Sequence, residues 1–428
     1  MILTAIAIIF VLGYLAIALE HPIKVNKTAS ALFLGTLLWI IWFKVSGDTH
    51  RSSEQLFHSF GDLAQILFFL MGAMTIVAIV DANDGFSIIT SRIKTNDVRA
   101  LMWIISWIAF FLSAVLDNLT TTIVMVTLSR KLVEDSKMRL YLAGVIVIAA
   151  NSGGAWSPIG DVTTTMLWIG GEISAAGIVK VLILPSIVSL LVPLAVLSIS
   201  IKGRINSDFQ VATQESSSFD RNVLFTAGVG GLLMVPVIKT VFHVPPYIAM
   251  LFILGILWTV VELLGRRHQV LPQRLNIYHV IKEVDVPSVL FFAGILLAVG
   301  VLGATGQLAS LAKILEDNIG HTSIIVLIIG VLSAVVDNVP LVAATMGMYS
   351  LQEFPMDNFL WEFIAFCAGT GGSMLVIGSA AGVAAMGIDR NLSFGWYLRK
   401  ITPLAALGYG SGAGTYLLLS DFIFHTVK

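Results

Sequence analysis

The sequence is poor in charged residues. Its 428 residues include 25 Lys and Arg and 26 Asp and Glu, together 12% of the chain, while 57% of the residues are apolar. Water-soluble proteins average about 25% charged residues, so the composition predicts an integral membrane protein that has the lipid bilayer as a partner. The formal net charge of −1 gives no field that would attract a phosphate backbone, which argues against nucleic-acid binding.

Cysteine and enzymatic motifs are scarce as well. Cys367 is the single cysteine and cannot form an intrachain disulfide. The chain contains no His-Glu-x-x-His, no Gly-x-Ser-x-Gly and no glycine followed by lysine, which a P-loop requires. We therefore expect no enzyme and no cofactor, and ATP-driven pumping would need another subunit.

Long apolar runs set the predicted layout. A helix needs roughly 20 residues to cross about 30 Å of hydrocarbon. The uninterrupted runs of about this length are residues 2–19, 28–45, 62–80, 178–201, 222–239, 245–264, 286–303 and 398–420. We predict that each is a transmembrane helix in an all-α, polytopic membrane protein.

Two further apolar stretches are interrupted by polar residues. Residues 101–130 break at Asp117-Asn118, and residues 324–351 break in the same way at Asp337-Asn338. Each break leaves two limbs that are too short to span the membrane comfortably. Two short helices that meet at a polar tip predict a re-entrant hairpin, because irregular backbone at membrane depth needs protein or water around it.

The order of the predicted elements repeats along the chain. Residues 140–170 and 359–388 each have room for one crossing with a glycine-rich break, so we predict two discontinuous helices. Three helices, a hairpin, a broken helix and one more helix then fill residues 1–201, and the same series fills residues 222–428. The hairpin motif Ser-Ala-Val-Leu-Asp-Asn of the first half recurs as Ser-Ala-Val-Val-Asp-Asn in the second. Residues 202–221 are polar and form the predicted cytoplasmic linker.

The basic residues predict the orientation. Lys and Arg concentrate in loops that are cytoplasmic if the chain crosses ten times and both termini lie outside. The loop after the first hairpin is basic, whereas the loop after the second contains no Lys or Arg, so the two loops should face opposite sides. The sequence therefore predicts two inverted repeats, an arrangement by which many secondary transporters place a site at the membrane midplane.

Aspartates sit at three of the predicted breaks. A carboxylate in hydrocarbon costs at least about 2.5 kcal/mol, which makes such a residue a candidate for function. Other oxygen donors surround the three aspartates, and no Lys or Arg lies within these motifs. The predicted ion- and proton-binding residues are Asp117, Asn118, Asp161, Asn151, Thr163, Thr164, Ser113, Thr121, Ser157, Asp337, Asn338, Ser333 and Ser373. Hard oxygen ligands suit a small hard cation, so we predict that Asp117, Asp161, Asn118 and Asn151 bind Na⁺ or Li⁺.

The two halves differ in their ligands. Asp161 aligns with Ser379 in the second half, and Asn151 aligns with Gly369. We therefore expect one asymmetric cation site centred on Asp117 and Asp161, with Asp337 contributing to it, to a second weaker site or to proton binding. Each aspartate could instead be a helix N-cap, although Asn or Ser would cap a helix without burying a charge.

A longer motif carries a resemblance. The Asp-Asn pair at each hairpin tip, joined to the stretch from Asn151 to Thr164 (NSGGAWSPIGDVTT), resembles the NhaD-type sodium/proton antiporters of the ion transporter superfamily. The resemblance implies a protein of the bacterial inner membrane that exports Na⁺ or Li⁺ in exchange for protons. It also implies a homodimer in which the hairpins and broken helices move against a static scaffold in an elevator-like way.

The mechanism implied by the residues is competition. Two carboxylates in one partly dehydrated site favour a shared proton, whereas a bound cation favours the ionised pair, so protons and Na⁺ exclude each other. Two alternatives stay open. A sodium-coupled dicarboxylate or citrate symporter would use the same tips for Na⁺, but aspartates would repel its anion. An arsenite carrier would prefer thiolate ligands, and Cys367 is alone.

Overall fold

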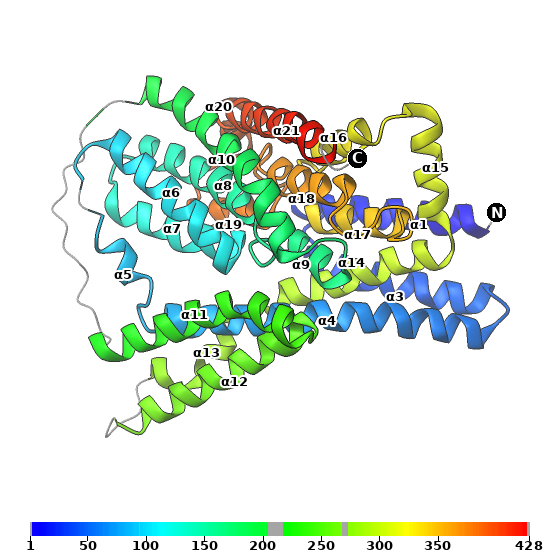
Figure 1. Ribbon diagram of the computed structural model, residues 1–428, viewed down its shortest axis with the longest axis horizontal. Coiled ribbons are helices and arrows are strands. Elements are labelled where there is room, and N and C mark those ends of the chain that lie inside the picture. Colours follow the sequence, from blue (N-terminus) through cyan, green and yellow to red (C-terminus); the bar gives the residue numbers. More distant parts are fainter. Residues whose placement is uncertain (1, 94, 202, 204–216, 268–272, 426–428) are drawn as a thin grey trace.

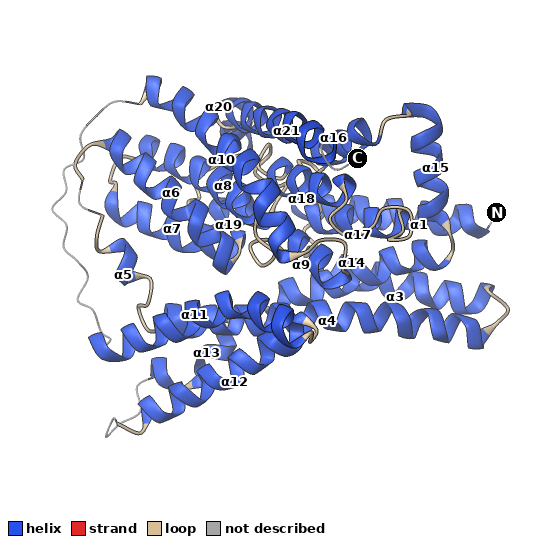
Figure 2. Ribbon diagram, in the orientation of Figure 1, coloured by secondary structure: helices blue, strands red, loops and turns tan. Residues whose placement is uncertain are grey.

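The computed structural model describes residues 2–93, 95–201, 203, 217–267 and 273–425. Every regular element in these residues is a helix (Figures 1 and 2), which confirms the predicted all-α class. Most of the predicted linker 202–221 lies outside the described residues.

The first half begins with helices that precede the predicted hairpin. These are α1 (Ile2–Ala18), α2 (Glu20–Ile23), α3 (Lys27–Val45), α4 (Thr49–Ala82) and α5 (Ser87–Thr90). The predicted hairpin consists of α6 (Val98–Leu116) and α7 (Asn118–Leu132), and the predicted broken helix consists of α8 (Ser136–Gly154) and α9 (Val162–Gly170). The half ends with α10 (Ala175–Ser200). The breaks thus fall at the aspartates, as the sequence predicts.

The second half has the same order of long elements. It begins with α11 (Ser218–Phe242), α12 (Pro246–Gly265), the short helices η1 (Gln273–Leu275), α13 (Ile277–Val280) and η2 (Ile281–Glu283), and then α14 (Val286–Ala304) and α15 (Gln307–Ile319). The hairpin limbs are α16 (Thr322–Leu332) and α17 (Asn338–Met348), and the broken helix is α18 (Phe359–Gly371) with α19 (Ala380–Ile388). The chain continues through α20 (Phe394–Lys400) and α21 (Thr402–His425).

Seven helices in the described residues are long and apolar enough to cross a membrane, or eight if the sharply bent pair α15 and α16 counts as one span. The seven are α3, α4, α6, α10, α11, α12 and α14. One of the seven is the hairpin limb α6, whose 19 residues are long enough to cross, although the sequence predicted limbs too short to span. The number of ten crossings stays a prediction, because besides the other six helices it needs α1, α21 and the two broken helices. One helix is much longer than predicted. α4 has 34 residues and begins at Thr49, because the polar residues before the predicted apolar run 62–80 continue the helix toward its N-terminus.

The broken helices form the centre of the molecule. All of Leu142–Gly154 in α8 and all of Leu360–Gly371 in α18 are buried. Both segments consist mostly of apolar and small residues, which permits burial on every face; Asn151 and Glu362 are buried polar exceptions. In Figure 1 the long helices α3, α4, α11 and α12 lie along one side, while α5 and α15 lie at opposite ends of the long axis.

The two hairpins contact the broken helices through equivalent residues. The Ser113 hydroxyl donates to the Ala150 carbonyl at 2.6 Å, and the Ser333 hydroxyl donates to the Ala368 carbonyl at 2.8 Å. The approach is close because α8 carries a glycine there: a Cβ added to Gly153 would lie 2.1 Å from the backbone of α6. Each hairpin is therefore held by backbone contact and by one buried hydroxyl against its own broken helix.

Candidate functional site

Asp161 is the centre of the predicted site and begins α9. Its side chain is buried, and its Oδ1 accepts hydrogen bonds from the Thr163 backbone N–H and hydroxyl, both at 2.9 Å. The Thr164 hydroxyl donates to the Asp161 carbonyl at 2.9 Å. Asp161 is therefore an N-cap, but a cap with a charge, whereas Ser379 caps α19 at the equivalent place in the second half.

The asparagines of both hairpin tips converge on Asp161. Asn118 Nδ2 donates to Asp161 Oδ2 at 2.6 Å. Asn338 Nδ2 donates to Oδ1 and Oδ2 of the same carboxylate at 3.4 and 3.3 Å. Both asparagines are buried. Three predicted elements, namely the two hairpins and the first broken helix at the start of α9, therefore meet at one carboxylate.

Asn151 connects this group to the second broken helix. Its Oδ1 accepts a hydrogen bond from Asn118 Nδ2 at 3.0 Å, and its Nδ2 donates to the hydroxyls of Ser373 and Ser379, both at 2.9 Å. The predicted residues Asn118, Asn151, Asp161 and Ser373 are thus brought together. Ser379 was not among the predicted site residues, although its alignment with Asp161 could have identified it.

Asp117 lies at the same tip as Asn118. Its carboxylate accepts from the Thr120 backbone N–H at 2.6 Å and from the Thr120 hydroxyl at 3.0 Å, which caps α7. The Asp117 and Asp161 carboxylates interact electrostatically. No ion pair of the described residues includes either of them. Two carboxylates without a basic partner are the charge that a cation would offset.

A small cavity lies beside the two aspartates. Its volume is about 30 Å³, and Asp117, Asn118 and Asp161 line it together with apolar residues of α4 such as Phe69 and Leu70. One water needs roughly 10–15 Å³ of such volume, so the cavity can hold a small ion or a few water molecules. Thr121, at the first turn of α7, is a further candidate ligand, because its buried hydroxyl has no hydrogen-bond partner among the described residues.

Three predicted ligands use their hydroxyls elsewhere. Ser113 and Ser333 donate to backbone carbonyls of α8 and α18, and Ser157 donates to the Ala114 carbonyl. These hydrogen bonds hold the hairpins and the broken helices together. They use the hydroxyl protons, so the oxygen lone pairs of the three serines stay available to a cation.

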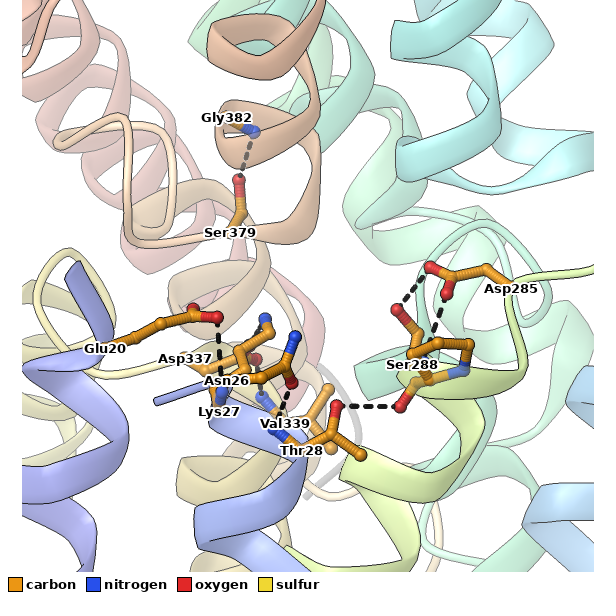
Figure 3. Close-up of polar contacts among 11 residues, drawn as sticks. Glu20, Asn26, Lys27, Thr28, Asp285, Ser288, Asp337, Val339, Ser379 and Gly382 are labelled. Carbon is orange, nitrogen blue, oxygen red and sulfur yellow. Dashed lines mark hydrogen bonds and ion pairs between the residues drawn. The ribbon is translucent and has the colours of Figure 1, made fainter. Parts of the chain in front are cut away.

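Asp337 has a partner that the motifs did not reveal. Its Oδ2 lies 3.7 Å from Lys27 Nζ, which belongs to the first residue of α3 (Figure 3). Its Oδ1 accepts from the Val339 backbone N–H at 3.3 Å and caps α17. The site motifs contain no basic residue, and Lys27 lies outside them, 310 residues before Asp337 in the sequence. The two hairpin tips therefore differ in their electrostatic surroundings.

A larger cavity lies at the other end of α9. Its volume is about 880 Å³, and Met166 and Glu172 line it together with His58 and Asp62 of α4. Burial raises the pKa of the Glu172 carboxyl to about 7; the nearby Asp62 charge raises it too, while a backbone hydrogen bond and Lys239 act in the opposite direction. Its Oε2 has no hydrogen-bond partner among the described residues.

The polar groups of the site are carboxylates, amides and hydroxyls. The described residues contain no group of three or more His, Cys, Asp or Glu that could hold a metal ion. The oxygens of the site are of the kind that binds a hard cation.

Comparisons with known proteins give a family and several relatives. A family model described as "Citrate transporter" (CitMHS) matches residues 14–365. Sodium/proton antiporters 1 and 2 of Arabidopsis thaliana are 46% and 43% identical to the chain; the alignments cover 98% and 97% of it and 73% and 99% of the relatives. The Na(+)/H(+) antiporter NhaD of Alkalimonas amylolytica is 31% identical, over 97% of the chain and 90% of the relative.

One solved structure shares the fold. The crystal structure of the Alcanivorax borkumensis YdaH transporter, described as having an unusual topology, matches with a TM-score of 0.54 over 86% of this chain and 87% of that one. The sequence identity is 13%, so this likeness concerns the fold alone.

Proposed function

Because the chain belongs to the citrate transporter (CitMHS) family of ion transporters, we propose that it is a secondary active antiporter that exchanges Na⁺ or Li⁺ for protons across a membrane. One observation carries the proposal: Asp117 and Asp161 line one small cavity and interact electrostatically without a basic partner among the described residues, and amides of both hairpins donate to Asp161. The relatives named Na⁺/H⁺ antiporters agree with this chemistry.

The exchange follows from competition for the two carboxylates. In the structure, Asn118 and Asn338 donate N–H groups to the Asp161 oxygens. An arriving Na⁺ takes the same oxygens, and rotation of an asparagine side chain presents its Oδ1 to the ion. Protonation of Asp117 or Asp161 removes the charge that holds Na⁺, so the two cargoes bind alternately.

Alternating access follows from the arrangement of the elements. The hairpins and broken helices move together, in an elevator-like way, against α3, α4, α11, α12 and α14. The equivalent bonds of Ser113 and Ser333 support this grouping, because each ties a hairpin to its broken helix. Their equivalence also supports a repeated arrangement of the two halves, which we propose is inverted. We place both termini outside and expect a homodimer; the bacterial inner membrane stays a prediction, since two of the relatives come from a plant.

A second candidate is sodium-coupled transport of citrate or a dicarboxylate, which the description of the family favours. The residues around Asp161 argue against it, because an anion would have to approach two carboxylates. Arsenite transport has less support: Cys367 is buried, and it is the only thiol in the chain.

The test is ²²Na⁺ flux in proteoliposomes. With an acidic interior and no organic anion, the proposal expects Na⁺ to enter while protons leave, and an imposed Na⁺ gradient should in turn move protons. If Na⁺ entered only when citrate or a dicarboxylate was added outside, the symporter would replace the antiporter. Arsenite flux without Na⁺ flux would favour the third class.

A further inference from the structure

The second hairpin tip contains an ion pair that crosses between two groups of helices. Lys27 Nζ lies 3.7 Å from Asp337 Oδ2, and the side chains are 26% and 16% exposed. Lys27 belongs to α3, whereas Asp337 begins α17. Figure 3 shows the two side chains directed toward each other.

Lys27 is held in place by its surroundings. Asn26 caps α3, and its side chain accepts from the Thr28 backbone N–H at 2.8 Å. The Lys27 backbone N–H donates to Glu20 Oε1 at 3.2 Å. The ammonium lies 4.5 Å from the centre of the Phe291 ring of α14, a cation–π arrangement. The ammonium is thus fixed at the tip of the second hairpin.

The first hairpin tip has no equivalent. Asp117 is bound by the N–H and hydroxyl of Thr120, and the described residues contain no ion pair to it. The two aspartates are equivalent in sequence, but one has a fixed ammonium beside it and the other has a small cavity.

We propose that Lys27 is a built-in cation for the second hairpin tip, so that its ammonium takes the place beside Asp337 that a transported ion takes beside Asp117 and Asp161. Asp337 is then a positioning residue and not a ligand of the cargo. This proposal rests on the proposed antiport and deepens it, because it assigns the chain a single transported-cation site.

The ion pair acts on that site through the next residue. Asn338 follows Asp337 directly and donates to both oxygens of Asp161. Tyr14 of α1 also lies against Asp337, so α1, α3 and α14 together fix the tip. When Lys27 is removed, Asp337 keeps a charge that is mostly shielded from water and has lost its partner. The tip must then shift, and Asn338 moves with it.

The first experiment tests the Lys27–Asp337 ion pair by thermal stability, so its result does not depend on which ion the protein transports. Lys27→Met, Asp337→Asn and the double variant are purified, and their melting temperatures are compared. Removing one partner of a shielded pair costs more than removing both, and Asn keeps the cap on α17. We therefore expect the double variant to melt higher than either single variant, and well above the temperature that the sum of the two single effects would give. If the melting-temperature changes of the two single variants simply added in the double variant, the two side chains would not interact and the proposal would fail.

The second experiment measures Na⁺/H⁺ exchange. Lys27→Met should raise the Na⁺ KM by roughly three- to tenfold with little change in kcat, as expected for loss of a partly exposed charge pair. Lys27→Arg should retain the wild-type KM, and so should the control Lys44→Met, which changes an exposed lysine in the last turn of α3.

The ratio of protons to Na⁺, obtained from the reversal potential, decides the role of Asp337. The proposal expects the same ratio in wild type, Lys27→Met and Asp337→Asn. A lower Na⁺ count per cycle in Asp337→Asn would make Asp337 a ligand of the cargo and refute the built-in cation. If wild type itself exchanged no Na⁺ for protons, the antiport proposal would fail, while the melting experiment would still report on the ion pair.

Discussion

Asn338 donates hydrogen bonds to both carboxylate oxygens of Asp161, at 3.4 and 3.3 Å, although the two residues belong to different halves of the chain. Asn118 reaches the same carboxylate from the first hairpin. The matching tips therefore do not form two matching sites. They share one acidic residue, because the second half has Ser379 where the first has Asp161.

Asp161→Asn should abolish exchange and leave the fold intact. Asparagine caps a helix as well as aspartate does, so α9 should still begin at Val162, but no charge remains to hold Na⁺. We expect the exchange rate to fall by about 100-fold or more, which corresponds to about 2.7 kcal/mol. Proton-gradient fluorescence in proteoliposomes measures the rate, and the melting temperature reports the fold.

Asp161→Ser provides the matched control, since it copies the residue at the equivalent position of the second half. It should cap α9 and be equally inactive. Normal exchange in either variant would mean that Asp161 is only a cap.

At Asp117, we predict that substitution by glycine and substitution by alanine differ in their effect on stability. Its φ of 131° is a backbone conformation that suits glycine. Asp117→Gly should therefore unfold at a higher temperature than Asp117→Ala, by about 1–2 kcal/mol in stability, because glycine removes the strain and is also the better N-cap. Both variants should lose exchange. Equal melting temperatures would show that the tip relaxes without cost.

Thr121→Val tests a buried hydroxyl that has no partner among the described residues. Removing such a group should leave stability unchanged or slightly higher, because no hydrogen bond is lost. If the hydroxyl binds the cation, the Na⁺ KM should rise roughly tenfold, or about 1.4 kcal/mol. Thr122→Val is the matched control, since Thr122 is also buried with an unpartnered hydroxyl but points about 100° away on α7. Equal KM changes in both variants would exclude a specific ligand.

The sequence was sufficient to locate the breaks. A carboxylate inside an apolar run is costly, so Asp117 and Asp337 marked the ends of short helices, and the structure begins α7 and α17 directly after them. The sequence also grouped Asn118, Asn151 and Asp161, because all three are oxygen-bearing side chains near breaks of the first half, and the structure places Asn118 within hydrogen-bond distance of the other two.

The Lys27–Asp337 pair was not predictable from the motifs. Lys27 lies at the edge of an ordinary apolar run, and only the packing of α3 against α14 brings it to the hairpin tip, where the Thr28 hydroxyl donates to the Pro287 carbonyl at 3.0 Å. The same holds for Ser157: composition shows that a hydroxyl is present, but only the fold shows which carbonyl it bonds to.

The last prediction concerns pH and Glu172. Its folded pKa is raised to about 7 from 4.5, mainly by burial. The neutral form is therefore favoured in the folded protein, and the stability that this group contributes is fully present below about pH 4.5 and is lost as the pH rises through 7. Wild type should melt at a lower temperature at pH 8 than at pH 5 in part for this reason.

Glu172→Gln keeps the shape of the neutral side chain and cannot ionise. The variant should match wild type at pH 5 and melt higher than wild type at pH 8, by roughly 1 °C for each kcal/mol in a chain of this size. Glu54→Gln is the control, because Glu54 lines the same large cavity but is exposed, and it should leave the difference between the two pH values unchanged. If Glu172→Gln showed the wild-type pH dependence, Glu172 would be ionised in the folded protein already at pH 5. Lys239, whose charge favours the ionised form, would then outweigh burial at this cavity.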